Sequence, residues 1–108
     1  MNDDEIDERY LRGKIYTIQN RLDDTKIYVG STIETLGERW AKHKHDCKYY
    51  NSRVSFYKHI NNNDWADWEI KLYQEYPCKN KRELEKKEYE IIGSFGDRAL
   101  NKKRIFHG

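Results

Sequence analysis

Two apolar and β-branched stretches, residues 14–19 and 26–31, begin the regular pattern of the chain. The segment between them, residues 20–25, is rich in turn-forming asparagine and aspartate, so the pattern predicts an antiparallel hairpin. Pairing the strands about the middle of this loop places Tyr16 opposite Tyr28, and side-chain alternation then puts both phenols on one face. The other face carries Ile15 and Thr17 beside Ile27 and Val29.

A helix is expected directly after the hairpin, because residues 35–38 have the form of a capping box. The Thr35 hydroxyl and the Glu38 carboxylate can satisfy free N–H groups at a helix start, so the helix begins at about Leu36. A shorter second helix is predicted over residues 52–60, before three consecutive asparagines. Its candidate core positions are Val54, Phe56, Tyr57 and Ile60.

The third strand is predicted over residues 68–73, where apolar and polar positions alternate. Pro77 then breaks the pattern, and Asn80 followed by Glu83 gives a second capping signal, for a helix that runs through Ile92. One strand face carries Trp68, Ile70 and Leu72, and the other carries Glu69, Lys71 and Tyr73. The 108 residues therefore predict an α+β domain in the order β-β-α-α-β-α, a small three-stranded antiparallel sheet packed with about three helices.

Two residues of the first helix indicate phosphate chemistry. Arg39 and His43 are four positions apart, so they lie one turn above each other on a single face. A guanidinium offers a planar fork for a phosphate, and an imidazole can move protons near neutral pH. Together with the two phenols of the hairpin, these groups suit the handling of a phosphodiester.

Six positions in a fixed order carry a resemblance to a known family. They are the triplets Lys14-Ile15-Tyr16 and Tyr28-Val29-Gly30, the helical pair Arg39 and His43, Glu88 four residues before Ile92, and Asn101. From Gly13 to Asn101 the chain resembles the GIY-YIG nucleases. It departs from their pattern where Lys14 replaces a glycine, although Gly13 precedes it, and where Val29 replaces an isoleucine. Residues 49–51 also hold two tyrosines and an asparagine where some relatives carry a second histidine, for which His45 is the candidate substitute.

The resemblance implies a metal-dependent endonuclease that hydrolyses nucleic-acid phosphodiester bonds, with DNA the favoured substrate. Glu88 is expected to hold one magnesium or manganese ion, and Tyr16 is the expected general base. A free phenol titrates near 10, so nearby cations must activate it. Of the other implied catalytic residues, Tyr28 and His43 orient groups or relay the proton, Arg39 neutralises the phosphate, and Asn101 supports the site. The basic side chains expected to contact nucleic acid are Lys14, Lys26, Lys42 and His45.

Several of these residues have alternative interpretations. Tyr16 and Tyr28 could be cross-strand packing partners, because tyrosine is common in strands. Glu88 lies in a charged run, so Glu85 and Glu90 remain rivals for the metal, although Glu90 is turned about 200° away on a helix. A zinc site is a further alternative, formed by His43, Cys47, His59 and Cys78, but none of the characteristic Cys-x-x-Cys spacings occurs.

Charge and cysteine content bound the setting of the protein. The formal net charge is +2, and residues 1–9 contain five acids and one arginine, so residues 10–108 carry +6. We therefore expect an acidic, flexible leader over residues 1–9 and a moderately basic nuclease-like domain over residues 10–108, which suits a polyanion. Two cysteines are too few for a disulfide framework, and no apolar stretch predicts a membrane span, so an intracellular location is expected.

The competing function is a binding module, in which a nuclease-like fold grips nucleic acid or a protein without cutting. All six family positions are filled, which argues against such degeneration. A catalytic domain of this size still needs a source of specificity: it could recognise branched structure, form a homodimer, act with a protein partner, or cut with little sequence preference.

Overall fold

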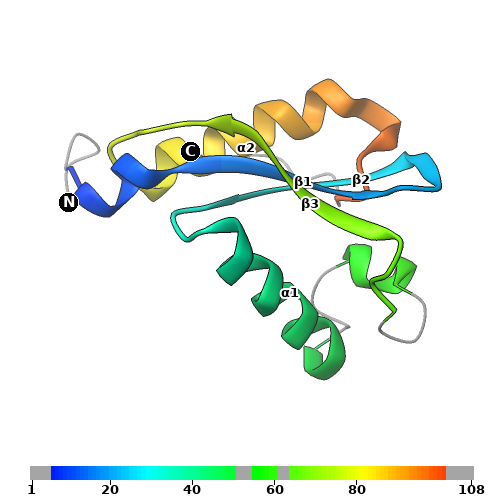
Figure 1. Cartoon of the computed structure of the whole chain (residues 1–108). Helices are drawn as coiled ribbons and strands as arrows, with labels where there is room; N and C mark the ends of the chain where they lie inside the picture. Colours follow the sequence, from blue (N-terminus) through cyan, green and yellow to red (C-terminus); the bar gives the residue numbers. More distant parts are fainter. Residues whose placement is uncertain (1–5, 51–54, 61–63, 102–108) are drawn as a thin grey trace.

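A computed structural model describes residues 6–50, 55–60 and 64–101 of the chain. Three strands, two α-helices and three short 3-10 helices follow one another along this part of the chain (Figure 1). In order, they are η1 (Glu8–Arg12), β1 (Lys14–Asn20), β2 (Asp23–Thr32), α1 (Leu36–Tyr50), η2 (Ser55–His59), β3 (Trp68–Glu75), α2 (Lys81–Phe95) and η4 (Gly96–Arg98). The predicted α+β class is confirmed.

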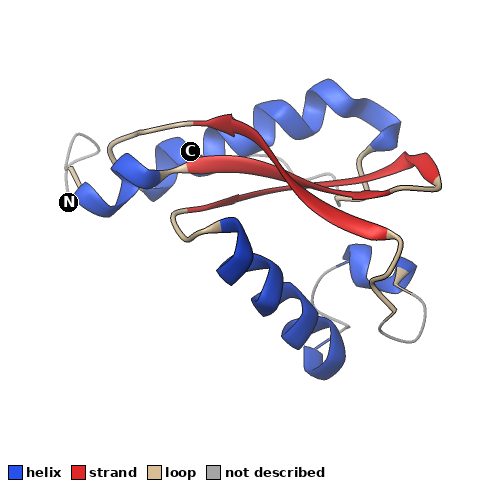
Figure 2. Cartoon of the chain, viewed as in Figure 1, coloured by secondary structure: helices blue, strands red, loops and turns tan. Residues whose placement is uncertain are grey.

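The sheet is antiparallel with the strand order β2-β1-β3, and helices cover both of its faces (Figure 2). One face packs against α1 and η2 through a cluster that includes Tyr16, Ile18 and Phe56. The other packs against α2 through Ile15 and Val29, among others. Because β1 is the central strand, its alternate side chains supply both cores.

The register of the hairpin differs from the prediction. Tyr16 pairs with Gly30, and Tyr28 pairs with Ile18, so the two tyrosines are diagonal neighbours and not directly opposite. The turn is shorter than expected: Asn20 pairs with Asp23, and the ladder then skips residues 24–26. This irregularity shifts the register by two residues, an even number, so Tyr16 and Tyr28 still share one face.

Two other predicted elements change in extent. The predicted helix over residues 52–60 is the five-residue 3-10 helix η2, and residues 52–54, including Val54, lie outside the described residues. Its predicted core residues Phe56, Tyr57 and Ile60 are buried. The third strand is two residues longer than predicted, and a bulge between its pairs to Ile15 and Tyr16 leaves Tyr73 without a partner in the ladder.

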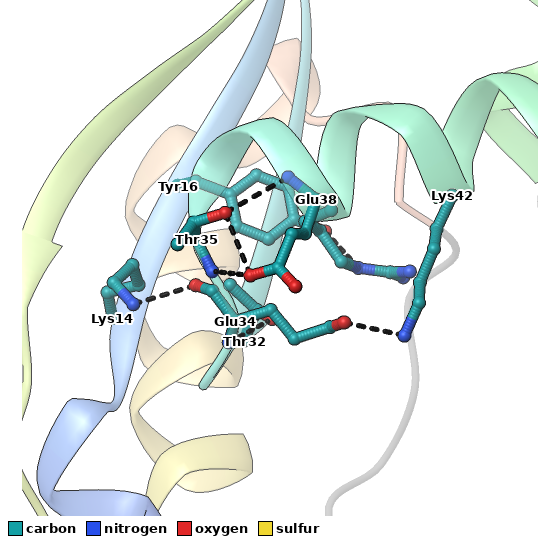
Figure 3. Close-up of polar contacts among 8 residues, drawn as sticks. Lys14, Tyr16, Thr32, Glu34, Thr35, Glu38 and Lys42 are labelled. Atoms are coloured by element: carbon teal, nitrogen blue, oxygen red, sulfur yellow. Dashed lines mark hydrogen bonds and ion pairs between the residues drawn. The ribbon is translucent and has the colours of Figure 1, made fainter.

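Side-chain caps fix both α-helices, as the sequence predicted. At the start of α1, the Thr35 hydroxyl accepts a hydrogen bond from the Glu38 N–H, and Glu38 Oε1 accepts one from the Thr35 N–H, each at 3.1 Å (Figure 3). At α2, Asn80 Oδ1 accepts from the Glu83 N–H at 3.0 Å. Local chemistry therefore sets where each helix begins, and with it the positions of the side chains that the helix presents.

The described part of the predicted leader is attached to the domain. Asp7 caps η1 through its side chain, which accepts from the Arg9 N–H, and its own N–H donates to the Lys79 carbonyl at 2.7 Å. The boundary predicted between residues 9 and 10 therefore falls inside η1. Residues 1–5 lie outside the described residues.

Candidate active site

Tyr16 is the central residue of the candidate site. Its side chain is fully buried and crosses from the middle strand over the edge strand at Gly30, its partner in the ladder. A Cβ atom at Gly30 would overlap the Cζ and hydroxyl oxygen of Tyr16. The glycine of the second triplet is thus needed to admit the tyrosine of the first triplet.

Helix α1 brings Arg39 and His43 to the Tyr16 hydroxyl. Arg39 Nε donates a hydrogen bond to that hydroxyl at 3.2 Å, and His43 Nε2 lies 2.7 Å from it. The two helical residues are one turn apart, as their spacing predicted, and they meet the same oxygen atom. The structure therefore brings together three of the residues that the sequence singled out.

The His43 imidazole is buried on the sheet side of α1, and its exposed fraction is zero. Burial, assisted by the charge of Arg39, lowers its pKa from 6.5 to about 3. The ring is therefore neutral at neutral pH. Its Nδ1 lies 2.9 Å from the hydroxyl of Tyr57, a residue of η2.

The two triplet tyrosines have raised pKa values. Burial raises the pKa of Tyr16 to about 12, against the opposing effect of Arg39, and the charges of Glu88 and Glu34 raise it further. Burial also raises the pKa of Tyr28, whose ring stacks on Phe56 at a centroid distance of 4.2 Å. Both phenols thus carry their protons at neutral pH in the free protein.

Glu88 reaches the same region from the opposite side of the sheet. It lies on α2, and its Oε1 accepts a hydrogen bond from the Ser31 hydroxyl on β2 at 2.6 Å. Its charge raises the pKa of Tyr16 and of Tyr28, so it acts on both phenols across the edge strand. The rivals Glu85 and Glu90 are exposed, whereas Glu88 is half-buried.

Asn101 supports the edge strand and does not meet the Tyr16 hydroxyl cluster. Its side-chain oxygen accepts from the Val29 N–H at 3.0 Å, and its Nδ2 donates to the Val29 carbonyl at 2.8 Å. The Leu100 N–H donates to the Ile27 carbonyl at 2.7 Å on the same strand. Asn101 therefore fixes the backbone between Tyr28 and Gly30 in the manner of an added strand.

Comparison with family models matches residues 12–103 to the GIY-YIG catalytic domain. The chain belongs to the GIY-YIG family. Among solved structures, the catalytic domain of the homing endonuclease I-TevI has a TM-score of 0.67 and 22% identity, covering 85% of this chain and 99% of that chain. A mutant of the catalytic domain of the intron endonuclease I-TevI has a TM-score of 0.65 and 23% identity, covering 89% and 95%. Both matches show the fold. A search of characterised protein sequences gives no significant match.

Membership of the GIY-YIG family supports a nuclease activity and makes a metal ion relevant. In the described residues, no three His, Cys, Asp or Glu side chains gather to hold an ion. Glu88 is a single carboxylate that is half-buried and oriented by Ser31. Such a site fits magnesium, which keeps several waters and often binds through one carboxylate together with substrate phosphates.

Neither α-helix in the described part of the chain is long and apolar enough to cross a bilayer.

The geometry does not favour the zinc alternative. Both ring nitrogens of His43 face phenol hydroxyls. Cys47 and Cys78 lie in different core clusters, on opposite faces of the sheet. His59, the fourth candidate ligand, is exposed. The four proposed zinc ligands therefore lie in different environments. Some are side chains in the core and one is a surface group, so they do not form one site.

The four basic residues predicted to contact nucleic acid all have protein partners (Figure 3 shows Lys14 and Lys42). Lys14 Nζ donates to the Glu34 carbonyl at 2.7 Å, and Lys42 pairs with the Glu34 carboxylate at 2.6 Å. Lys26 lies 3.9 Å from Asp23, and His45 Nδ1 lies 3.4 Å from Asp46. The Lys42, Lys26 and His45 side chains are each at least two-fifths exposed, so a phosphate can compete for them.

Sequence reasoning missed three residues of this site. Tyr57 was predicted only as core, and Ser31 and Glu34 were not singled out. Ser31 could have been found, because it directly follows the second triplet on a strand. Tyr57 and Glu34 carry no such signal, since their contacts with His43, Lys14 and Lys42 depend on tertiary packing.

Proposed function

We propose that the domain is a divalent-metal-dependent endonuclease that hydrolyses phosphodiester bonds of DNA. One observation supports it most: the Tyr16 hydroxyl contacts both Arg39 and His43, while Glu88 acts on it from across the edge strand. The family supports a nuclease. The net charge of +6 over residues 10–108 suits a polyanion, and two similar structures are described as homing and intron endonucleases, which favours DNA.

Arg39 is the proposed phosphate ligand. Only its Nε is used by Tyr16, and its terminal guanidinium nitrogens donate no hydrogen bond to the described residues. They can therefore donate to the two non-bridging oxygens of the scissile phosphate in bidentate geometry. Charge that develops on the phosphate in the transition state is stabilised by this fixed cation.

Tyr16 is the proposed general base. The base is its deprotonated form: the phenolate oxygen, stabilised by the hydrogen bond from Arg39 Nε, accepts a proton from the attacking water and becomes the neutral phenol again. A pKa of about 12 in the free protein is too high for efficient catalysis at neutral pH. Glu88 would hold the divalent ion, whose positive charge would stabilise the leaving 3′ oxygen and lower the pKa of Tyr16.

A cleavage assay tests the proposal. Supercoiled plasmid, single-stranded, flap and branched DNA, with RNA of matched sequence, are incubated with magnesium, with manganese and with EDTA. We expect metal-dependent cleavage of at least one DNA substrate, and its loss in Tyr16→Phe and Glu88→Gln. Glu90→Gln, an exposed residue of the same helix, is the matched control and should cleave normally. Tight DNA binding without cleavage in either metal would instead favour the binding module.

A further inference from the structure

Helix α1 carries an excess of positive charge that neither α2 nor the exposed edge strand β3 matches. It contains four lysine or arginine residues against two carboxylates, whereas α2 contains four of each. On β3, one lysine stands with two glutamates. The later turns of α1 extend away from the sheet, which leaves their outer face open to a large ligand (Figure 1). A polyanion is therefore attracted to α1 more than to either of the other two elements.

Lys42 and Tyr49 follow Arg39 along one side of this helix. At about 100° per residue, Lys42 lies about 60° and Tyr49 about 80° from Arg39 in the same direction around the axis. The rise of about 1.5 Å per residue puts Tyr49 roughly 15 Å beyond Arg39 along the axis. The Lys42 side chain is 58% exposed, although it pairs with Glu34. A strand whose scissile phosphate is bound by Arg39 can thus pass Lys42 and reach Tyr49 within a few nucleotides.

Tyr49 is the most exposed tyrosine of the described residues, with 59% of its surface accessible. The His45 ring lies 4.8 Å from the Tyr49 ring, and Lys48 Nζ lies 5.3 Å from its centroid. An exposed aromatic ring beside cations has the composition of a stacking platform, in which the ring stacks on an unpaired base and the cations contact nearby phosphates. Bases inside a duplex are already stacked on one another, so only an unpaired base can use this ring.

Asp46 limits where the phosphates of such a strand can lie. It is one turn beyond Lys42, and its side chain is 42% exposed, 3.4 Å from His45 Nδ1. A carboxylate repels a phosphate, but it can accept a hydrogen bond from the exocyclic amino group of a base. Along this part of α1 the strand is therefore expected to turn its bases towards the helix, which requires them to be unpaired.

We propose that α1 binds a single-stranded segment of DNA next to the scissile phosphate, with an unpaired base stacked on Tyr49 and phosphates contacted by Lys42 and Lys48. The substrate class is then DNA with an unpaired strand, such as a flap or another single-stranded branch, and not continuous duplex. This inference rests on the proposed function for its role in cleavage. Binding of the single strand itself requires no catalysis.

Binding without cleavage tests the proposal. Fluorescence anisotropy in EDTA measures the affinity of the full chain for a labelled oligothymidine and for a labelled hairpin duplex with the same number of phosphates. We expect Tyr49→Ala to weaken oligothymidine binding about 5- to 150-fold, the range of one lost stacking contact, with little change for the hairpin. Tyr49→Phe keeps the ring and should bind as the wild type does. Tyr73→Ala removes a 48% exposed tyrosine from β3 and is the matched control, which should change neither affinity.

Four results would overturn the proposal. They are no binding of oligothymidine by the wild type, unchanged binding in Tyr49→Ala, equal weakening for the single strand and the hairpin, and a loss in Tyr49→Phe as large as in Tyr49→Ala. Cleavage of flap DNA separates this inference from the nuclease function. If flap DNA is cleaved but Tyr49→Ala binds oligothymidine normally, only the inference fails. Tyr49-dependent binding without cleavage in magnesium or manganese would support the α1 site and count against the nuclease function.

Discussion

The ring of Tyr16 packs directly over the backbone of Gly30, its partner across the β1–β2 ladder. The contact couples the two triplets, because the absence of a side chain at Gly30 on the edge strand allows the buried Tyr16 phenol to reach Arg39 and His43. Asn101 binds both backbone groups of Val29, the residue before Gly30, and so holds the same stretch of β2.

Gly30→Ala should destabilise the fold. The added Cβ overlaps a ring that is buried and cannot move aside freely, and overpacking of this kind costs about 1–3 kcal/mol in the free energy of unfolding. Urea denaturation measures it. Gly93→Ala is the control, because a Cβ there meets nothing within 4 Å on α2, and it should be neutral or stabilise by up to about 1 kcal/mol. Equal effects of the two substitutions would contradict the close approach.

Tyr16→Phe and Tyr28→Phe should differ in rate. Tyr16 loses a hydroxyl that contacts both Arg39 and His43, and removal of a general base costs about 10²- to 10⁴-fold in kcat. The Tyr28 hydroxyl makes no hydrogen bond with the described residues and its ring stacks on Phe56, so the loss of rate should be smaller. Single-turnover rates at saturating substrate compare them. Small and equal losses would rule out Tyr16 as the base.

Glu88→Gln should weaken metal binding. The amide keeps an oxygen for the Ser31 hydroxyl but loses the negative charge that a hard cation needs. Loss of several kcal/mol of metal-derived stabilisation predicts a rate reduction of about 10²-fold or more. Magnesium titration by calorimetry and by cleavage rate checks this. Glu85→Gln and Glu90→Gln, both exposed, should behave as wild type; loss of metal dependence in either would move the ligand there.

The pH dependence of cleavage should follow Tyr16. The active form is deprotonated, and the pKa of the group in the free protein is about 12, so log(kcat/KM) should rise with pH through the neutral and mildly alkaline range with a slope of about 1. His43, with a pKa of about 3, should add no step near 6.5. A plateau that begins near pH 6.5 in the wild type would show that His43 titrates and accepts the proton.

Stability should also depend on pH through His43. Its pKa is about 3 in the folded protein and 6.5 as a model value, so the unfolded chain binds more protons between these limits. The contribution is full above pH 6.5 and declines as the pH falls towards 3, by on the order of 4 kcal/mol. Denaturation of wild type and His43→Gln from pH 7 to pH 4 isolates it, because the carboxylates are common to both. Parallel curves would mean that His43 is protonated in the folded state.

The sequence by itself determined the local features of this protein. Capping signals at Thr35 and Asn80 placed the helix starts correctly, because a cap depends on residues within one turn. Strand alternation assigned Tyr16 and Tyr28 to the same face, and the i,i+4 spacing of Arg39 and His43 placed both on one side of α1. The six spaced positions indicated the family.

Only the tertiary structure decided what depends on distant parts of the chain. The irregular end of the hairpin pairs Tyr16 with Gly30 and not with Tyr28, since the register of a hairpin depends on how both strands fit the core. The hydrogen bond from Ser31 distinguishes Glu88 from Glu85 and Glu90, although all three lie in one charged run of the sequence. The Tyr57 hydroxyl reaches His43 from a 3-10 helix 14 residues further along the chain. Such contacts are made by packing across the sheet and its helices, and no local pattern in the sequence encodes them.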